Sequence, residues 1–143
     1  MQRRSPQSDP GSESDAPTVL VAVDESDAAA RGVDHALAVA ASWDGRLHVV
    51  HARPPAEAPP TDPPTTDPRR AQALVLTVAE RALDRGIPVE AVVRPGRPHR
   101  VIASYAEEIN ADLVVLGART DADYRGSVAS RVATATDRAV APV

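Results

Sequence analysis

Residues that could hold a phosphate group follow a short apolar run near the carboxyl end of the chain. Leu113 to Leu116 are all Leu or Val, and the run stops at Gly117. A polar loop follows, and the pair Gly126-Ser127 then precedes a pattern typical of a helix. Backbone N–H groups at a helix N-terminus attract anions, and the helix dipole strengthens this attraction. A strand, a glycine turn and a Gly-Ser pair at a helix start therefore indicate phosphate binding.

The other reactive side chains do not form a recognisable catalytic or metal-binding set. His48 and His51 are three residues apart on an expected strand, so they should point to opposite faces. We expect His35 on an exposed helix face. His99 fits a solvent-facing turn, and a helix cap or a ligand contact is its alternative role. No serine lies in a Gly-x-Ser-x-Gly elbow. We therefore expect no catalytic residues and no metal site.

Composition limits the class of protein. The 143 residues suit one domain, and hydrophobic residues make up 43% of them. Cysteine is absent, which excludes disulfides, thiolate catalysis and cysteine-ligated zinc. The net charge of −4 argues against a general nucleic-acid-binding protein. Neither an apolar run of roughly 18 residues nor a secretory signal is recognisable, so we expect a cytoplasmic protein without membrane contact.

Apolar runs alternate with helical stripes along the chain. The runs are apolar at successive positions, which is typical of strands buried on both faces, and the stripes have the period of amphipathic helices. The expected strands are residues 18–23, 47–52, 89–93 and 112–116. The expected helices contain residues 33–43, with Ser26 as a cap, 71–82, 102–109 and 128–139. Residues 1–17 should be a disordered tail, followed by one domain over residues 18–143, in which the proline-rich residues 54–68 form a connecting loop.

This alternation predicts an α/β fold with a single doubly wound parallel sheet and helices on both faces. Ligands bind such sheets at the carboxyl ends of the strands, where the strand order reverses. Asp24, Ala52, Gly96 and Gly117 lie at or just past the expected strand ends. Because many activities share this fold, the architecture alone assigns no chemistry.

Four pieces of the chain carry a family resemblance through their order and spacing. They read VLVAVDESDAAARGVDHALAVA, LHVVHA, VVRPGRPHRVIASYAEEINADLVVLG and GSVASRV. Together they resemble the universal stress protein (UspA) family over nearly all of residues 17–143. The resemblance implies a Rossmann-like, adenine nucleotide α-hydrolase-like fold. It also implies a small cytoplasmic stress-response protein that forms a homodimer.

The resemblance also implies a nucleotide site. ATP-binding members of the family have a loop of pattern G-x2-G-x9-G-[S/T], whose glycines let backbone amides approach the phosphates. Their first strand ends in an Asp that contacts the nucleoside, as does the end of their second strand. The matching cofactor-binding positions in this chain are Asp24, Ala52, Gly117, Gly126, Ser127 and Val128.

The loop of this chain departs from the ATP-binding pattern. Thr120 stands where the second glycine is expected, and only residues 121–125 separate it from Gly126, which makes the loop four residues shorter. Asp121 and Asp123 place negative charge near the phosphate position, and two arginines of the same loop offset part of it. We therefore expect ATP binding to be weak or absent.

The end of the chain departs from the family as well. The family continues after Ala141-Pro142-Val143 into a fifth apolar strand, which is often the edge through which its members dimerise. Here the sequence stops at Val143. We therefore expect a fifth strand that is missing or very short, and a fourth strand with a free side.

Three functions fit these observations. The leading interpretation is a universal stress protein that acts as a binding or regulatory module without catalysis. The second is an ATP-binding switch of the same family with at most slow hydrolysis. The third is a fold-related nucleotide-dependent enzyme, for which sustained turnover would be the distinguishing observation. For all three we expect neither nucleic acid nor a membrane as partner.

Overall fold

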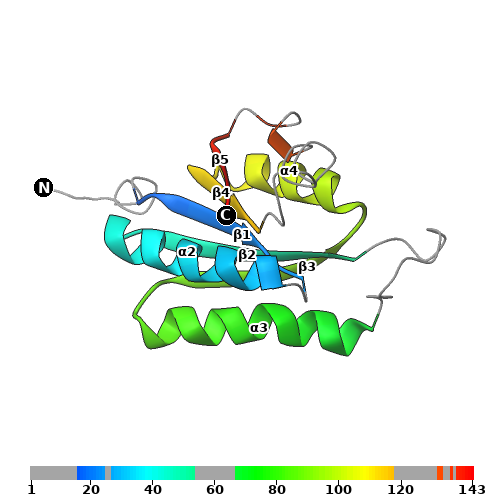
Figure 1. Cartoon of the computed structure of the whole chain (residues 1–143), viewed down its shortest axis with the longest axis horizontal. Helices are drawn as coiled ribbons and strands as arrows, with labels where there is room; N and C mark the ends of the chain where they lie inside the picture. Colours follow the sequence, from blue (N-terminus) through cyan, green and yellow to red (C-terminus); the bar gives the residue numbers. More distant parts are fainter. Residues whose placement is uncertain (1–15, 25–26, 54–66, 118–131, 134–135, 137) are drawn as a thin grey trace, which may run out of the picture.

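The chain forms one five-stranded parallel sheet in the order β3-β2-β1-β4-β5 (Figure 1). The computed structural model describes residues 16–24, 27–53, 67–117, 132–133, 136 and 138–143. The strands are β1 (Thr18–Ala22), β2 (Arg46–Arg53), β3 (Val89–Pro95), β4 (Leu113–Leu116) and β5 (Val140–Pro142). The helices are α2 (Asp27–Trp43), α3 (Pro68–Asp84) and α4 (Pro98–Glu108). The predicted α/β fold with a single doubly wound parallel sheet is confirmed.

Helices cover both faces of the sheet. Helices α2 and α3 pack on one face and α4 packs on the other (Figure 1). Side chains of β1 alternate between these faces, so that Val21 packs with Leu37 of α2 while Leu20 packs with Ile102 of α4. This arrangement explains why the strand is apolar at successive positions.

Strand β1 is central and fully buried. Val19, Leu20 and Val21 are each 0% exposed, and β1 pairs with β2 on one side and with β4 on the other. The chain leaves this strand at Asp24, which is exposed. The side chain of Asp24 therefore lies at the edge of the sheet where the parallel strands end, next to the central strand.

Helix α3 begins before its apolar stripe. Asp67 accepts a hydrogen bond of 2.9 Å from the backbone N–H of Arg69, and Pro68 occupies the first turn, where its missing N–H is not needed. The helix ends at Asp84 with Arg85 as its C-cap, and Gly86 follows in the C′ position that the sequence predicted, with a φ of 74°. Both ends of the helix are thus specified locally.

The expectation of a free side on the fourth strand is wrong. Strand β5 pairs with β4, and the N–H of Val143 donates to the carbonyl of Leu116 at 2.8 Å. The fifth strand is present but very short, as it covers Val140–Pro142. The family resemblance had placed the fifth strand after these residues. Pro142 is tolerated there because an edge strand needs only one of its two hydrogen-bonding sides.

Several predictions from the sequence fall outside the described residues. These are the cap at Ser26, the tail except for its last two residues, most of the proline-rich loop, and most of the last helix. Of the residues 128–139 predicted for that helix, 132–133 are helical, but 136, 138 and 139 are not, so the predicted extension of the helix to residue 139 is wrong. Within the described residues, no helix is both long and apolar enough to cross a membrane.

Candidate functional site

Three of the six predicted nucleotide-binding positions meet at the carboxyl edge of the sheet. Asp24 follows β1, Ala52 is near the end of β2, and Gly117 follows β4. These strands are neighbours in the sheet, and the chain reverses its strand order between β1 and β4. Such a switch point is where open parallel sheets bind ligands.

The strand register places these residues at the same level. Ala22 pairs with Val50, so Asp24 lies level with Ala52 two residues further on. The ladder between β1 and β4 puts Gly117 within one residue of that level. Because neighbouring strands lie about 4.8 Å apart, the three strand ends span about 10 Å. That width is suited to a ligand of nucleoside size.

The side chains of Asp24 and Ala52 do not face one cavity. Ala52 is half-buried and packs against the core on the α4 side of the sheet. Asp24 is exposed and lines a groove on the opposite side, between α2 and α3. Of the three, Asp24 alone therefore presents a polar side chain at this edge.

Gly32 supports the position of Gly117, and sequence reasoning missed it. A Cβ atom at Gly32 would lie 3.2 Å from the backbone nitrogen of Gly117, closer than an ordinary contact. A side chain at residue 32 would therefore push helix α2 and the end of β4 apart by a few tenths of an ångström. A glycine inside a helix costs about 1 kcal/mol relative to alanine. That cost is the signal in the sequence that could have identified this close approach.

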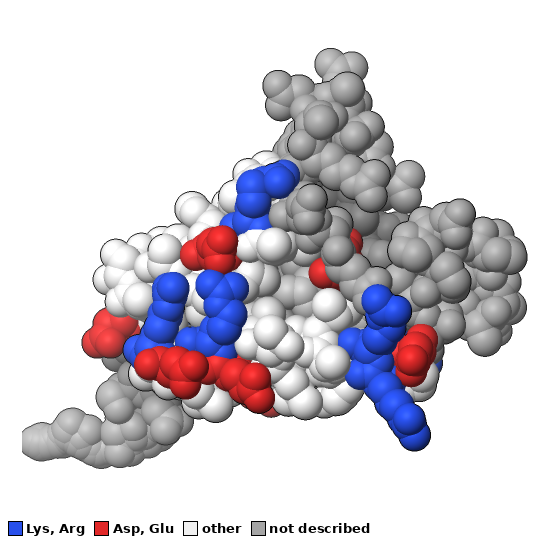
Figure 2. Space-filling view, turned by 60° about the horizontal axis from the view of Figure 1, so that its bottom comes forward, with Lys and Arg blue, Asp and Glu red and all other residues white. Residues whose placement is uncertain are grey.

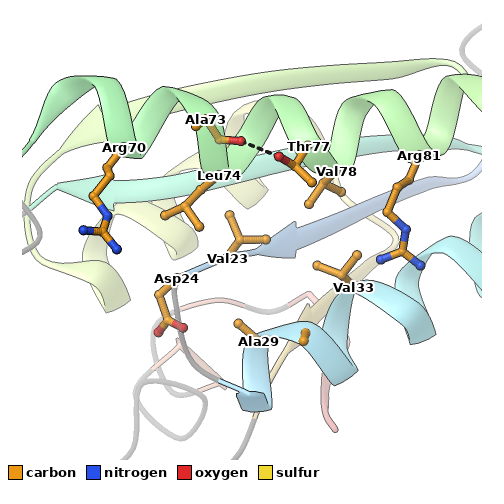
Figure 3. A pocket seen from close by; sticks show the side chains of 11 residues that line it. Val23, Asp24, Ala29, Val33, Arg70, Ala73, Leu74, Thr77, Val78 and Arg81 are labelled. Carbon is orange, nitrogen blue, oxygen red and sulfur yellow. Dashed lines mark hydrogen bonds between the residues drawn. The ribbon is translucent and has the colours of Figure 1, made fainter.

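The groove between α2 and α3 has a volume of about 670 Å³. Val23, Leu74 and Val78 point into it, while Arg70 and Arg81 stand toward its opposite ends (Figure 3). Figure 2 shows most charged side chains of this view in a group on the left and a group on the right, with a largely uncharged surface between them. The groove can therefore hold an apolar ring that carries charge at its periphery.

Two polar groups of this groove are already engaged. Arg81 forms an ion pair of 2.8 Å with Asp34. The hydroxyl of Thr77 donates to the carbonyl of Ala73 in its own helix, at 2.8 Å (Figure 3). The other charged side chains that line the groove are those of Asp24 and Arg70.

His51 is a buried polar residue beside the strand ends. Its side chain is 4% exposed, and Nδ1 donates to the carbonyl of Val23 at 2.7 Å. Nε2 is buried without a hydrogen-bond partner. His48, by contrast, contacts Tyr105 of α4. The prediction that the two histidines point to opposite faces is confirmed.

A polar network connects β2, β3 and α4 on the other face. Nδ1 of His48 lies 2.9 Å from the Tyr105 hydroxyl, and the Arg94 guanidinium lies 4.6 Å from the centre of the Tyr105 ring. Arg94 also donates to both carboxylate oxygens of Glu108, at 2.8 and 2.9 Å. This double hydrogen bond lowers the pKa of Glu108 and raises that of Arg94. Burial raises the pKa of Tyr105 to about 12.

Burial also lowers the pKa of His48, with an opposing effect of Glu90 and a smaller lowering effect of Arg46. The neutral imidazole accepts the hydrogen bond of the Tyr105 hydroxyl. As the pH falls, the His48 imidazole becomes protonated near pH 6.5 in the unfolded chain and at a lower pH in the folded protein. The contribution of His48 to the free energy of unfolding is therefore fully present above about pH 6.5. It decreases as the pH falls toward the pKa of His48 in the folded protein.

We expect the free energy of unfolding to decrease between about pH 7.5 and about pH 5.5, and His48→Gln to flatten this decrease. Glutamine keeps an acceptor for Tyr105 but does not titrate. Urea unfolding at the two pH values measures the effect. His35→Gln is the matched control, because His35 is exposed on α2 and its replacement should leave the pH dependence unchanged. Equal pH slopes for His48→Gln and the unaltered protein would contradict this account.

The remaining predicted positions, Gly126, Ser127 and Val128, lie outside the described residues. His35 is exposed, as predicted, and His99 is half-buried. Within the described ranges, no three His, Asp or Glu residues are grouped as metal ligands.

Comparisons with known proteins agree with this architecture. A model of the universal stress protein family matches residues 16–142. A crystal structure of a universal stress protein in complex with cAMP superposes with a TM-score of 0.70 at 26% identity, covering 89% of this chain and 96% of that chain. The universal stress protein from Archaeoglobus fulgidus in complex with dAMP gives a TM-score of 0.68 at 25% identity, covering 87% and 94%. A family member from Burkholderia pseudomallei shares the fold, with a TM-score of 0.69 at 24% identity over 88% and 94%.

Proposed function

Because this chain belongs to the universal stress protein family, we propose that it is a regulatory module that binds an adenine mononucleotide without catalysis. The binding site is the carboxyl edge of β1, β2 and β4. The observation that carries this proposal is the position of Asp24, an exposed carboxylate at the switch point of the sheet. A carboxylate accepts hydrogen bonds from both hydroxyls of a ribose.

Two further observations support a nucleotide with a single phosphate group. The similar structures were solved with cAMP and dAMP, each of which has a single phosphate. This chain keeps Gly117 and the Gly126-Ser127 pair, and the sequence predicts a helix after that pair, whose N-terminus would favour one phosphate group. An adenine monophosphate therefore needs less of the loop than ATP does.

A triphosphate should bind weakly for geometric and electrostatic reasons. The connection of residues 121–125 is four residues shorter than the ATP-binding pattern. Asp121 and Asp123 are acidic. One carboxylate at 6 Å repels one phosphate charge by about 0.7 kcal/mol in water and by more in a less polar site. Each phosphate group beyond the first would therefore be repelled by these carboxylates and would find fewer backbone amides in the shorter loop.

A role without catalysis is supported by the residues at the strand ends. Asp24 is the titratable member of the described set, and Ala52 and Gly117 have no reactive side chain. Nucleophilic catalysis would need a nucleophile and a base within hydrogen-bonding distance of each other. We further propose that the protein acts in the cytoplasm as a homodimer, with β5 available as the outer strand of the sheet.

The test of this proposal is calorimetric titration with AMP. We expect saturable binding, and we expect Asp24→Ala to weaken it about tenfold, because one charged hydrogen bond contributes about 1.5–3 kcal/mol. Asp84→Ala is the matched control, since Asp84 is an exposed carboxylate at the far end of α3. Unchanged AMP affinity in Asp24→Ala, or equal losses in both variants, would contradict the assigned site.

A further inference from the structure

Arginines surround a second cavity, at the carboxyl end of β3 and the start of α4. It has a volume of about 480 Å³, and the side chains of Arg94, Arg97, Arg100 and Ser104 line it. The whole chain has a net charge of −4, whereas the side chains that line this cavity carry a local excess of positive charge. We propose that this cavity binds a small dissolved molecule that carries two neighbouring phosphate groups. This proposal does not rest on the nucleotide site.

Three of the lining residues share one face of α4 and its cap. Arg97 is the N-cap, and Arg100 and Ser104 follow three and seven positions later. Residues with this spacing lie above one another on a helix. The two guanidinium groups and the hydroxyl are therefore presented along one line, which suits a ligand with more than one anionic group.

Arg94 closes the cavity from the strand side and is held in place. Its guanidinium forms the double hydrogen bond with Glu108 and lies over the ring of Tyr105. That ion pair uses only part of the donors of a guanidinium. Because its orientation is already fixed, Arg94 can bind an anion at a lower cost in side-chain entropy than a mobile arginine.

The other two arginines are not neutralised in the same way. Arg97 and Arg100 are exposed, and among the described residues neither has an ion pair with a carboxylate. Of the three guanidinium groups that line the cavity, only that of Arg94 is paired with a carboxylate among the described residues, that of Glu108. An anion in the cavity would relieve the repulsion among these like charges. Phosphate fits because its oxygens accept paired hydrogen bonds from a guanidinium.

Gly96 brings the two sides of the cavity together. Its φ is 133°, and a Cβ atom there would lie 2.9 Å from Cγ2 of Val101. The end of β3 can therefore turn tightly onto the first turn of α4 only with glycine at this position. This turn places Arg94 beside Arg97 and Arg100. The cavity volume lies within the range of about 300–1,000 Å³ typical of small-molecule sites.

Pyrophosphate is the probe for this proposal. We expect saturable calorimetric binding of pyrophosphate to the full chain at low salt, and weaker binding of orthophosphate. The double variant Arg97→Gln/Arg100→Gln should weaken pyrophosphate binding about tenfold or more, because charged hydrogen bonds are lost. Arg69→Gln/Arg85→Gln is the matched control, since it removes the same charge from exposed positions on and just after α3. Both variants should melt near the temperature of the unaltered protein, as all four residues are exposed.

The outcomes separate this site from the nucleotide site. Asp24→Ala should leave pyrophosphate binding unchanged, and Arg97→Gln/Arg100→Gln should leave AMP binding unchanged. The proposal is overturned if the unaltered chain shows no saturable binding, or if the Arg69/Arg85 control loses as much affinity as the cavity variant. It is also overturned if pyrophosphate binds no more tightly than orthophosphate.

Discussion

Val21→Asp should destabilise the folded protein by about 4 kcal/mol or more. Val21 is 0% exposed and lies in the central strand, where it pairs with Val49 on one side and Val115 on the other. A carboxylate there would be buried among apolar side chains without a hydrogen-bond donor. Because domains of this size are stable by about 5–15 kcal/mol, the variant should be largely or partly unfolded.

Chemical unfolding followed by circular dichroism measures this effect. Leu83→Asp is the matched control, because Leu83 is 63% exposed near the end of α3. Its replacement introduces the same group and should cost less than about 1 kcal/mol. A Val21→Asp protein that unfolds at the same denaturant concentration as the unaltered chain would show that Val21 is not a core residue.

Lengthening the loop should raise ATP affinity at least tenfold. The variant replaces residues 121–125 by nine Gly/Ser-rich residues and adds Thr120→Gly. It gives the backbone amides more room to surround the phosphates, removes two carboxylates, and restores the glycine that the ATP-binding pattern has at this position. Calorimetric titration with ATP and Mg²⁺ measures the gain.

Two further variants show whether loop length is the cause. Thr120→Gly alone should change ATP affinity little, because the connection stays too short. Asp24→Ala in the lengthened variant should remove much of the gained affinity, since the nucleoside would lose its carboxylate. If Thr120→Gly alone restores binding, loop length is not the limiting factor.

The sheet was predictable because its strands are buried on both faces. The sequence predicted a strand over residues 18–23, and β1 covers Thr18–Ala22. Helix α3 was harder to delimit. Its cap Asp67 and first residue Pro68 lie at the end of a proline-rich stretch, whose composition favours a loop. The local capping signal was present, but it was hidden by its surroundings.

Strand β5 could not be predicted from its own residues. Three residues that include Pro142 have no recognisable strand pattern. The strand exists because the edge of β4 offers partners, such as the carbonyl of Leu116 for the N–H of Val143. Pairing between distant segments, rather than local propensity, therefore specifies this element.

The candidate site was predictable in part for a related reason. Parallel strands bring their carboxyl ends to one edge, so Asp24, Ala52 and Gly117 could be grouped once the order of elements was known. The groove between α2 and α3 and the cavity around Arg97 could not be predicted. Both depend on how helices rest on the sheet, and that geometry is set by packing at positions such as Gly32 and Gly96.

The most direct test of the central claim compares AMP with ATP on the unaltered protein. Calorimetric titrations with AMP and with ATP and Mg²⁺, together with a mass spectrum of any co-purified ligand, provide the measurement. We predict that ATP binds more weakly than about 100 μM, equivalent to a binding free energy near −5.5 kcal/mol, and no more tightly than AMP. Binding of ATP at low micromolar concentration and more tightly than AMP would contradict the claim that the short loop excludes a triphosphate.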